Sequence, residues 1–148
     1  MSASKQELPD AVVASTVEKT KNKAEEYIRD PEKSKQLYEE ALKKAKEKEK
    51  NKGPLADLWN SLTALFRLLH AYIRHEYTDI PWGSLVLVVV AILYFVLPFD
   101  LIPDWIPIAG FIDDAAVIAF VIRQIKVDLD NFLKWEAEQT TAHPGSTA

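Results

Sequence analysis

The sequence predicts an all-α protein built around a helical hairpin with an acidic, proline-rich turn. The prediction starts from residues 80–99, which form 20 consecutive residues without a charge. About 20 apolar residues is the length of a helix that crosses the hydrocarbon core of a bilayer. Prolines then forbid a continuous helix, and a second apolar helix is expected from Asp113 or Asp114 onward. Apolar residues at helical spacing over residues 10–50 and 55–77 predict the remaining helices.

The first 54 residues are expected to form a charged, partly disordered helical region. Residues 10–29 carry a weak apolar stripe at helical spacing. Residues 30–32, Asp-Pro-Glu, are typical of a helix start, because Asp caps free backbone N–H groups and Pro suits the first helical position. The next helix runs into a Lys/Glu segment, 43–52, and then into Gly-Pro at 53–54, which predicts a stop and a hinge. We interpret the Lys/Glu segment as a solvated helix face, with contact to anionic lipid headgroups as the alternative.

A second unit is expected over residues 55–138, followed by a disordered tail over residues 139–148. It opens with the clearest amphipathic helix, residues 55–77. Two interpretations of that helix are open: it lies in a membrane interface, or it packs on the core of its own domain. The hairpin follows over residues 82–122. Its first helical part covers about 16 residues between two prolines, or roughly 24 Å, which is short for a membrane span.

Charge and composition exclude several classes of function. There are 13 basic and 11 acidic residues up to Pro54, and 5 basic and 11 acidic residues after it, for a net charge of −4. A mildly acidic chain is not suited to general nucleic-acid binding. The absence of cysteine excludes disulfides and thiolate sites. Because the sequence also lacks a phosphate-binding loop and a nucleophile motif, no catalytic residue is predicted and an enzyme is not the favoured class.

The distribution of basic residues predicts an orientation in the membrane. No Lys or Arg occurs between Arg74 and Arg123, whereas basic residues flank the hairpin on both sides. By the positive-inside rule, both ends of the hairpin and the N-terminal region are expected on the cytoplasmic side. Tryptophan is enriched at membrane interfaces, and interface anchors are therefore predicted at Trp59, Trp82 and Trp105.

The turn of the hairpin carries the candidate site. Its four aspartates are Asp100, Asp104, Asp113 and Asp114. We interpret them as helix caps and turn formers. The alternative is a site for Mg²⁺ or Ca²⁺, or for shared protons, because neighbouring carboxylates suit hard cations and raise one another's pKa. No other cofactor is expected. The shape of the turn is assigned to Pro98, Pro103, Pro107 and Gly110.

The turn and the residues beside it resemble one known family. The pattern Pro-x-Asp-x-Ile-Pro-Asp-x-Ile-Pro-x-x-Gly-x-x-Asp-Asp begins at Pro98 and ends at Asp114, with every fixed position matched. This resembles the core of the YkvA-like family, a bacterial domain of unknown function. The resemblance covers roughly residues 82–122 and implies a small membrane-associated protein with a helical hairpin. It implies no catalytic residue.

The sequence as a whole favours a membrane-associated interaction or scaffold module. The lipid membrane is the expected partner, and a second protein or a second copy of this chain is a possible additional partner. A first alternative is a soluble helical bundle that binds a partner and has residues 84–97 as its buried central helix. A second alternative is cation-dependent transport or hydrolysis at the four aspartates.

Overall fold

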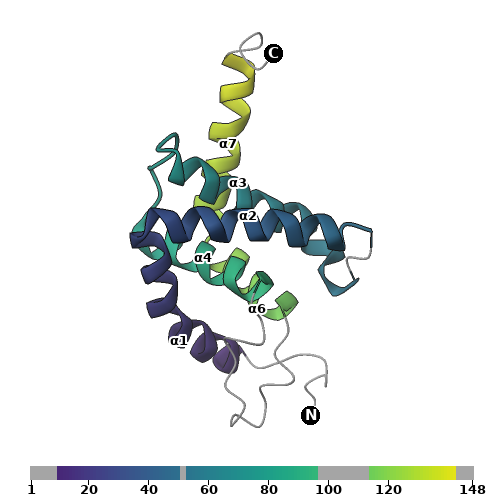
Figure 1. Ribbon diagram of the computed structural model, residues 1–148. Coiled ribbons are helices and arrows are strands. Elements are labelled where there is room, and N and C mark those ends of the chain that lie inside the picture. Colours follow the sequence, from purple (N-terminus) through teal and green to yellow (C-terminus); the bar gives the residue numbers. More distant parts are fainter. Residues whose placement is uncertain (1–9, 51–52, 97–113, 143–148) are drawn as a thin grey trace.

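The protein is helical throughout the part of the chain that is described. The computed structural model describes residues 10–50, 53–96 and 114–142, in which there are six α-helices, one 3-10 helix and no strand (Figure 1). The helices are α1 (Asp10–Arg29), α2 (Pro31–Lys48), η1 (Gly53–Leu58), α3 (Trp59–Ile73), α4 (Trp82–Val96), α6 (Asp114–Gln124) and α7 (Lys126–Ala142). The all-α prediction is confirmed.

The corner between α1 and α2 forms where the sequence predicts a helix start. Oδ1 of Asp30 accepts hydrogen bonds from the backbone N–H groups of Glu32 (3.0 Å) and Lys33 (3.3 Å). These are two of the donors at the start of a helix that have no intrahelical partner. The hydroxyl of the buried Ser34 donates to the carbonyl of Tyr27 in the last turn of α1. The two helices therefore meet at a corner with its own hydrogen bonds.

Helix α4 occupies the centre of the bundle. It contacts α1, α2, α3 and α6, and every side chain from Val88 to Phe95 is at most 1% exposed. Eight consecutive residues cover more than two helical turns, so α4 is buried on all of its faces. This is the arrangement of the predicted bundle with a buried central helix, as far as Val96. Among residues 10–50, 53–96 and 114–142, none of the helices combines the length and the apolar character that crossing a bilayer requires.

Helix α3 packs on the core and ends earlier than the sequence predicts. Leu62, Leu65 and Phe66 are buried, and the Phe66 ring lies 5.5 Å from that of Phe95 in α4. Of the two interpretations of this helix, packing on its own domain's core is confirmed. The predicted range of 55–77 is too long, since residues 53–58 form a 3-10 helix and α3 ends at Ile73.

The helix predicted after the turn is divided into α6 and α7 at Ile125. Buried Ile118 and Val121 pack α6 against α4. Helix α7 turns away, and its C-terminal half stands clear of the bundle (Figure 1). Arg67 of α3 binds Glu136 of α7 through two hydrogen bonds of 2.7 and 3.1 Å. Helix α7 continues to Ala142, into the segment that was predicted to be a disordered tail.

Two apolar positions differ from the predicted stripes. Leu42 of α2 and Leu133 of α7 belong to the apolar stripes of their helices in the sequence, but they are 44% and 37% exposed. Their neighbours Leu37, Ala41, Leu129 and Phe132 fill the inward positions. These two helices therefore carry apolar side chains beyond those that the bundle covers.

Candidate functional site

Most of the predicted site lies outside the described residues. Asp100, Asp104 and Asp113 fall there, and so do Pro98, Pro103, Pro107, Gly110 and Trp105. Asp114 is the first residue of α6, which agrees with the prediction of an acidic residue at the start of this helix. No group of three or more acidic or histidine side chains that could hold a metal ion occurs within the described ranges. The cation site at the turn therefore stays a prediction.

Two of the three predicted interface tryptophans, Trp59 and Trp82, lie in the described residues and have different surroundings. Trp59 is half-buried and lies edge-on to Phe95, with the ring centroids 6.3 Å apart. It belongs to the packing between α3 and α4. Trp82, the first residue of α4, is 42% exposed. Of these two, Trp82 is the more exposed.

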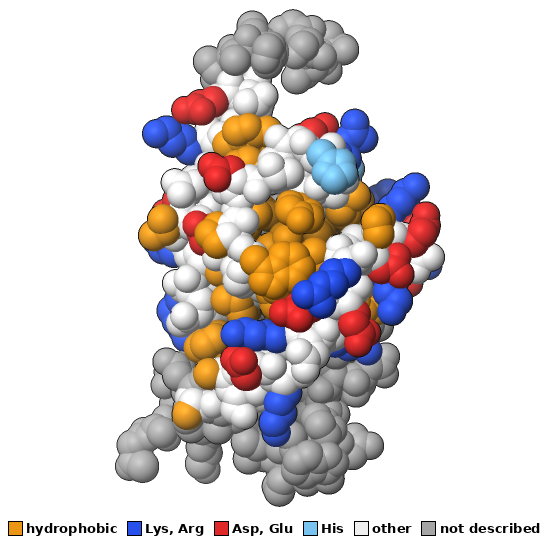
Figure 2. Space-filling model, turned by 90° about the vertical axis from the view of Figure 1, so that its left-hand side faces the viewer, with side chains coloured by type: hydrophobic (Ala, Val, Ile, Leu, Met, Phe, Trp, Pro, Cys, Tyr) orange, Lys and Arg blue, Asp and Glu red, His pale blue; other side chains and the backbone are white. Residues whose placement is uncertain are grey.

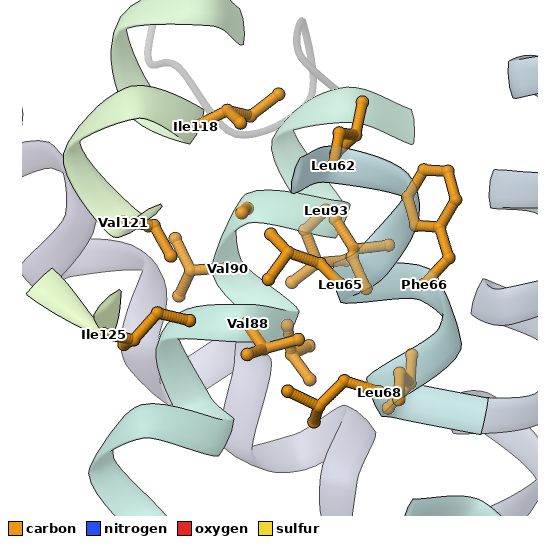
Figure 3. Packing of buried hydrophobic residues seen from close by; sticks show 14 of the residues in the cluster. Leu62, Leu65, Phe66, Leu68, Val88, Val90, Leu93, Ile118, Val121 and Ile125 are labelled. Carbon is orange, nitrogen blue, oxygen red and sulfur yellow. The ribbon is translucent and has the colours of Figure 1, made fainter. Parts of the chain in front are cut away.

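The structure brings α4 and α6 together as an antiparallel pair, which is the geometry of the predicted hairpin. In Figure 3, the α6 side chains from Ile118 to Ile125 run in the direction in which the α4 side chains run from Leu93 back to Val88. The side chains between the two helices are aliphatic and fully buried. The labelled side chains between the two helices are therefore suited to an apolar surrounding.

Helix α1 covers one side of this hairpin, where it contacts both α4 and α6. Its buried side chains, Val13, Val17, Thr20 and Ala24, are small and repeat at helical spacing. The Thr20 hydroxyl donates to the carbonyl of Thr16 at 3.0 Å, so the Tyr94 hydroxyl, 3.2 Å away, is the donor in the bond between the two side chains. This bond satisfies a phenol that is completely buried in α4.

The environment of Tyr94 disfavours its charged form. Burial raises the pKa of its hydroxyl above the ordinary value. The neutral phenol is thus held as a donor between α1 and the hairpin.

Both ends of α4 carry further polar contacts to the surrounding helices. At the C-terminal end, Nζ of Lys44 in α2 donates to the carbonyl of Val96 at 3.4 Å, where a positive charge also complements the helix dipole. At the N-terminal end, the Ser84 hydroxyl donates to Asp128 of α7. Near this end, burial raises the pKa of Tyr77, and the carboxylates of Asp79 and Asp128 raise it further.

The N-terminal end of α4 also binds α1 through Trp82. The guanidinium of Arg29 lies over the indole ring, 5.5 Å from its centroid, and the indole N–H donates to Glu25 over 3.5 Å. Figure 2 shows a band of hydrophobic side chains in the middle of one face of the molecule, bordered by basic and acidic side chains. The Trp82 indole therefore lies between a cation and a carboxylate.

Sequence reasoning missed the polar side chains that bind α4 to its neighbours, among them Thr20 and Lys44. Thr20 lies on the apolar stripe of α1, three residues after Val17 and four before Ala24. A hydroxyl at such a position is a signal for a buried polar partner, because buried hydroxyls are hydrogen-bonded. Lys44 gives no comparable signal, since it stands in a segment where Lys is the commonest residue.

The described part of the chain is a small helical bundle organised around the apolar α4–α6 hairpin. Residues 84–120 match the family described as "Protein of unknown function (DUF1232)". The chain is also 39% identical, over 77 residues, to a Bacillus subtilis (strain 168) protein named "Uncharacterized membrane protein YkvA"; the match covers 52% of this chain and 73% of that relative. The chain belongs to this family of unknown function, which confirms the YkvA-like resemblance. No solved structure matches the chain.

Proposed function

We propose that this protein is a membrane-associated interaction or scaffold module in which the α4–α6 hairpin engages lipid. The N-terminal region, residues 1–54, and the two ends of the hairpin lie on the cytoplasmic side in this proposal. Residues 55–138 form the membrane-engaging unit, and the partner is the bilayer itself.

The observation that carries the proposal is that α4 is apolar on every face. It has no charged residue from Trp82 to Val96, and only other helices of the same chain cover it. A helix in an ordinary surface position needs only one apolar stripe. A helix that is apolar all round is suited both to a protein core and to hydrocarbon, and the name of the relative supports the second environment.

Charge around the hairpin supports the proposed orientation. Arg74, after α3, and Arg123, near the end of α6, are exposed, and the chain has no Lys or Arg between them. Because translocation of a basic flank is disfavoured, both flanks stay on the side where the chain begins its insertion.

Flotation tests the proposal. The full chain is mixed with vesicles of phosphatidylcholine and phosphatidylglycerol and centrifuged through a density gradient. We expect the protein to float with the vesicles. A protein that stays at the bottom of the gradient at every lipid concentration, and in the high-speed supernatant of a cell lysate, contradicts the proposal.

Single-cysteine labelling locates the contact with lipid, because the natural sequence has no cysteine. Gly83→Cys places an environment-sensitive fluorophore at the start of α4, where an added Cβ meets no atom within 4 Å. Glu138→Cys on the exposed part of α7 is the control. With vesicles, the emission should shift to the blue for the label at residue 83 and stay constant at residue 138.

One observation favours a second candidate, a partner-binding bundle that keeps α4 closed. All faces of α4 are already covered by protein in the structure. This candidate predicts neither flotation nor a blue shift. A third candidate, a cation-dependent activity at the four aspartates, is tested by calorimetric titration of Mg²⁺ and Ca²⁺ into the wild type and into Asp104→Asn. If neither cation releases or absorbs heat on binding to the wild type, this candidate is excluded.

A further inference from the structure

We propose that α1 is a displaceable cover of the α4–α6 hairpin, and that the face beneath it is the face that a lipid bilayer occupies when α1 leaves. This inference rests on the proposed membrane function and adds how lipid binding is regulated. Helix α1 contributes no residue to the region that matches the family, residues 84–120.

The apolar side chains that α1 buries against the hairpin are small. Its buried apolar side chains are two valines and one alanine, Val13, Val17 and Ala24, whereas α4 presents Leu, Ile, Tyr and Phe side chains that are buried on every face. Small side chains remove little apolar area from water, and hydrophobic stabilisation follows that area. Removing α1 exposes the face of α4 beneath it, and that face then requires another apolar cover.

A bilayer supplies that cover and replaces the polar contacts as well. Helix α1 reaches the C-terminal end of α4 through Thr20–Tyr94 and the N-terminal end through the contacts of Glu25 and Arg29 with Trp82. Tyrosine and tryptophan are the side chains that favour the boundary between hydrocarbon and headgroups, because each has an apolar ring and one polar atom. Headgroup and water oxygens can accept from both rings after α1 leaves.

The corner between α1 and α2 allows α1 to move without unfolding α2. Both hydrogen bonds of the Asp30 cap are made to backbone N–H groups of α2, and none to α1. Helix α2 is held independently, since it packs on α3, where the Tyr38 ring stacks on His70 at 4.5 Å. Displacing α1 thus needs rotation at residues 29–31 and the loss of the hydrogen bonds that Ser34 and the Asp30 N–H donate to the Tyr27 carbonyl.

The test uses the buried hydrogen bond in a set of three variants. Thr20→Val leaves the Tyr94 hydroxyl buried without an acceptor only while α1 is in place, so it destabilises the covered state and not the lipid-bound one. We expect its affinity for vesicles to rise about tenfold, which corresponds to about 1.4 kcal/mol. Tyr94→Phe removes the phenol that needs the acceptor, so the double variant should bind vesicles within about twofold of the wild type.

A matched control and a second perturbation separate the cover from general stability. Thr63→Val removes the same kind of hydroxyl, which donates to the Asn60 carbonyl at 3.0 Å in α3, away from α1. Its vesicle affinity should equal that of the wild type. Arg29→Gln loosens the other end of α1 at the protein surface, without altering the core, and should raise vesicle affinity about twofold to threefold.

Hydrogen exchange on the full chain reports the position of α1 directly. With vesicles, the amides of residues 12–29 should lose protection, while those of residues 62–73 keep it. If the protein floats but residues 12–29 stay protected and Thr20→Val binds like the wild type, the cover is refuted while the membrane function stands. If neither the wild type nor Thr20→Val floats, the membrane function itself fails. Loss of protection that depends on protein concentration and comes with dimers refutes lipid as the occupant.

Discussion

Replacing His75 by glycine should stabilise the protein, because His75 has a φ of 61°. It follows α3 in a C-terminal capping motif: its N–H donates to the Tyr72 carbonyl (3.0 Å) and the N–H of Glu76 to the Ala71 carbonyl (2.8 Å). A left-handed residue with a side chain costs about 1–2 kcal/mol, and glycine costs about 0.5–1 kcal/mol of extra chain entropy. The expected gain for His75→Gly is about 0.5–1 kcal/mol.

Thermal and urea unfolding measure this gain. For a chain of this size, it corresponds to a Tm increase of about 1–4 °C. His75→Ala keeps the left-handed backbone and removes the imidazole, so it should not stabilise. Glu76→Gly adds the same flexibility at the next position and should destabilise by about 0.5–1 kcal/mol. A His75→Gly variant that is less stable than the wild type, or an alanine variant that gains as much, refutes the backbone explanation.

Three further outcomes are expected. Asp30→Ala should cost about 1 kcal/mol in urea unfolding, because it removes the acceptor of both cap bonds of α2; an unchanged midpoint contradicts the cap. The pKa of Tyr94 is raised in the folded state, so the unfolded chain loses the phenol proton first and the free energy of unfolding should fall as the pH rises above 10. Tyr94→Phe should weaken this fall. Equal dependence of stability on pH in the wild type and the variant contradicts the prediction. Glu136→Gln weakens an exposed ion pair with Arg67. Hydrogen exchange of the backbone amides after residue 136 should accelerate, while the free energy of unfolding changes by about 1 kcal/mol or less. Unchanged exchange means that the pair does not hold α7.

Local signals predicted much of the helical layout. Asp30 and Pro31 mark a boundary by their own chemistry, and α1 lies within the range predicted from its apolar stripe. The end of α3 was missed because a left-handed capping residue is usually glycine, and here the position is His75. The break at Ile125 was missed because no proline or glycine marks it; the apolar pattern continues while the covering surface changes.

The environment of α4 could not be read from its own sequence. A segment such as Val88 to Phe95, apolar at each position, satisfies hydrocarbon and a protein core equally well. The difference lies in whether other helices cover it, and that depends on residues far away in the chain, such as Thr20. The sequence predicted the hairpin and an acidic residue at the start of α6, where Asp114 lies. It could not predict the interhelical contacts of α4, because these depend on tertiary packing.

The bond between Thr20 and Tyr94 also sets a sequence of events during synthesis. Its two residues are 74 positions apart, a distance that a ribosome covers in roughly 4–15 s. Helix α1 therefore leaves the ribosome before α4 does. When α4 emerges, α1 is available at once, whereas α6 follows α4 along the chain. The first partner that α4 can pack against is therefore an N-terminal helix of its own chain, before the hairpin is complete.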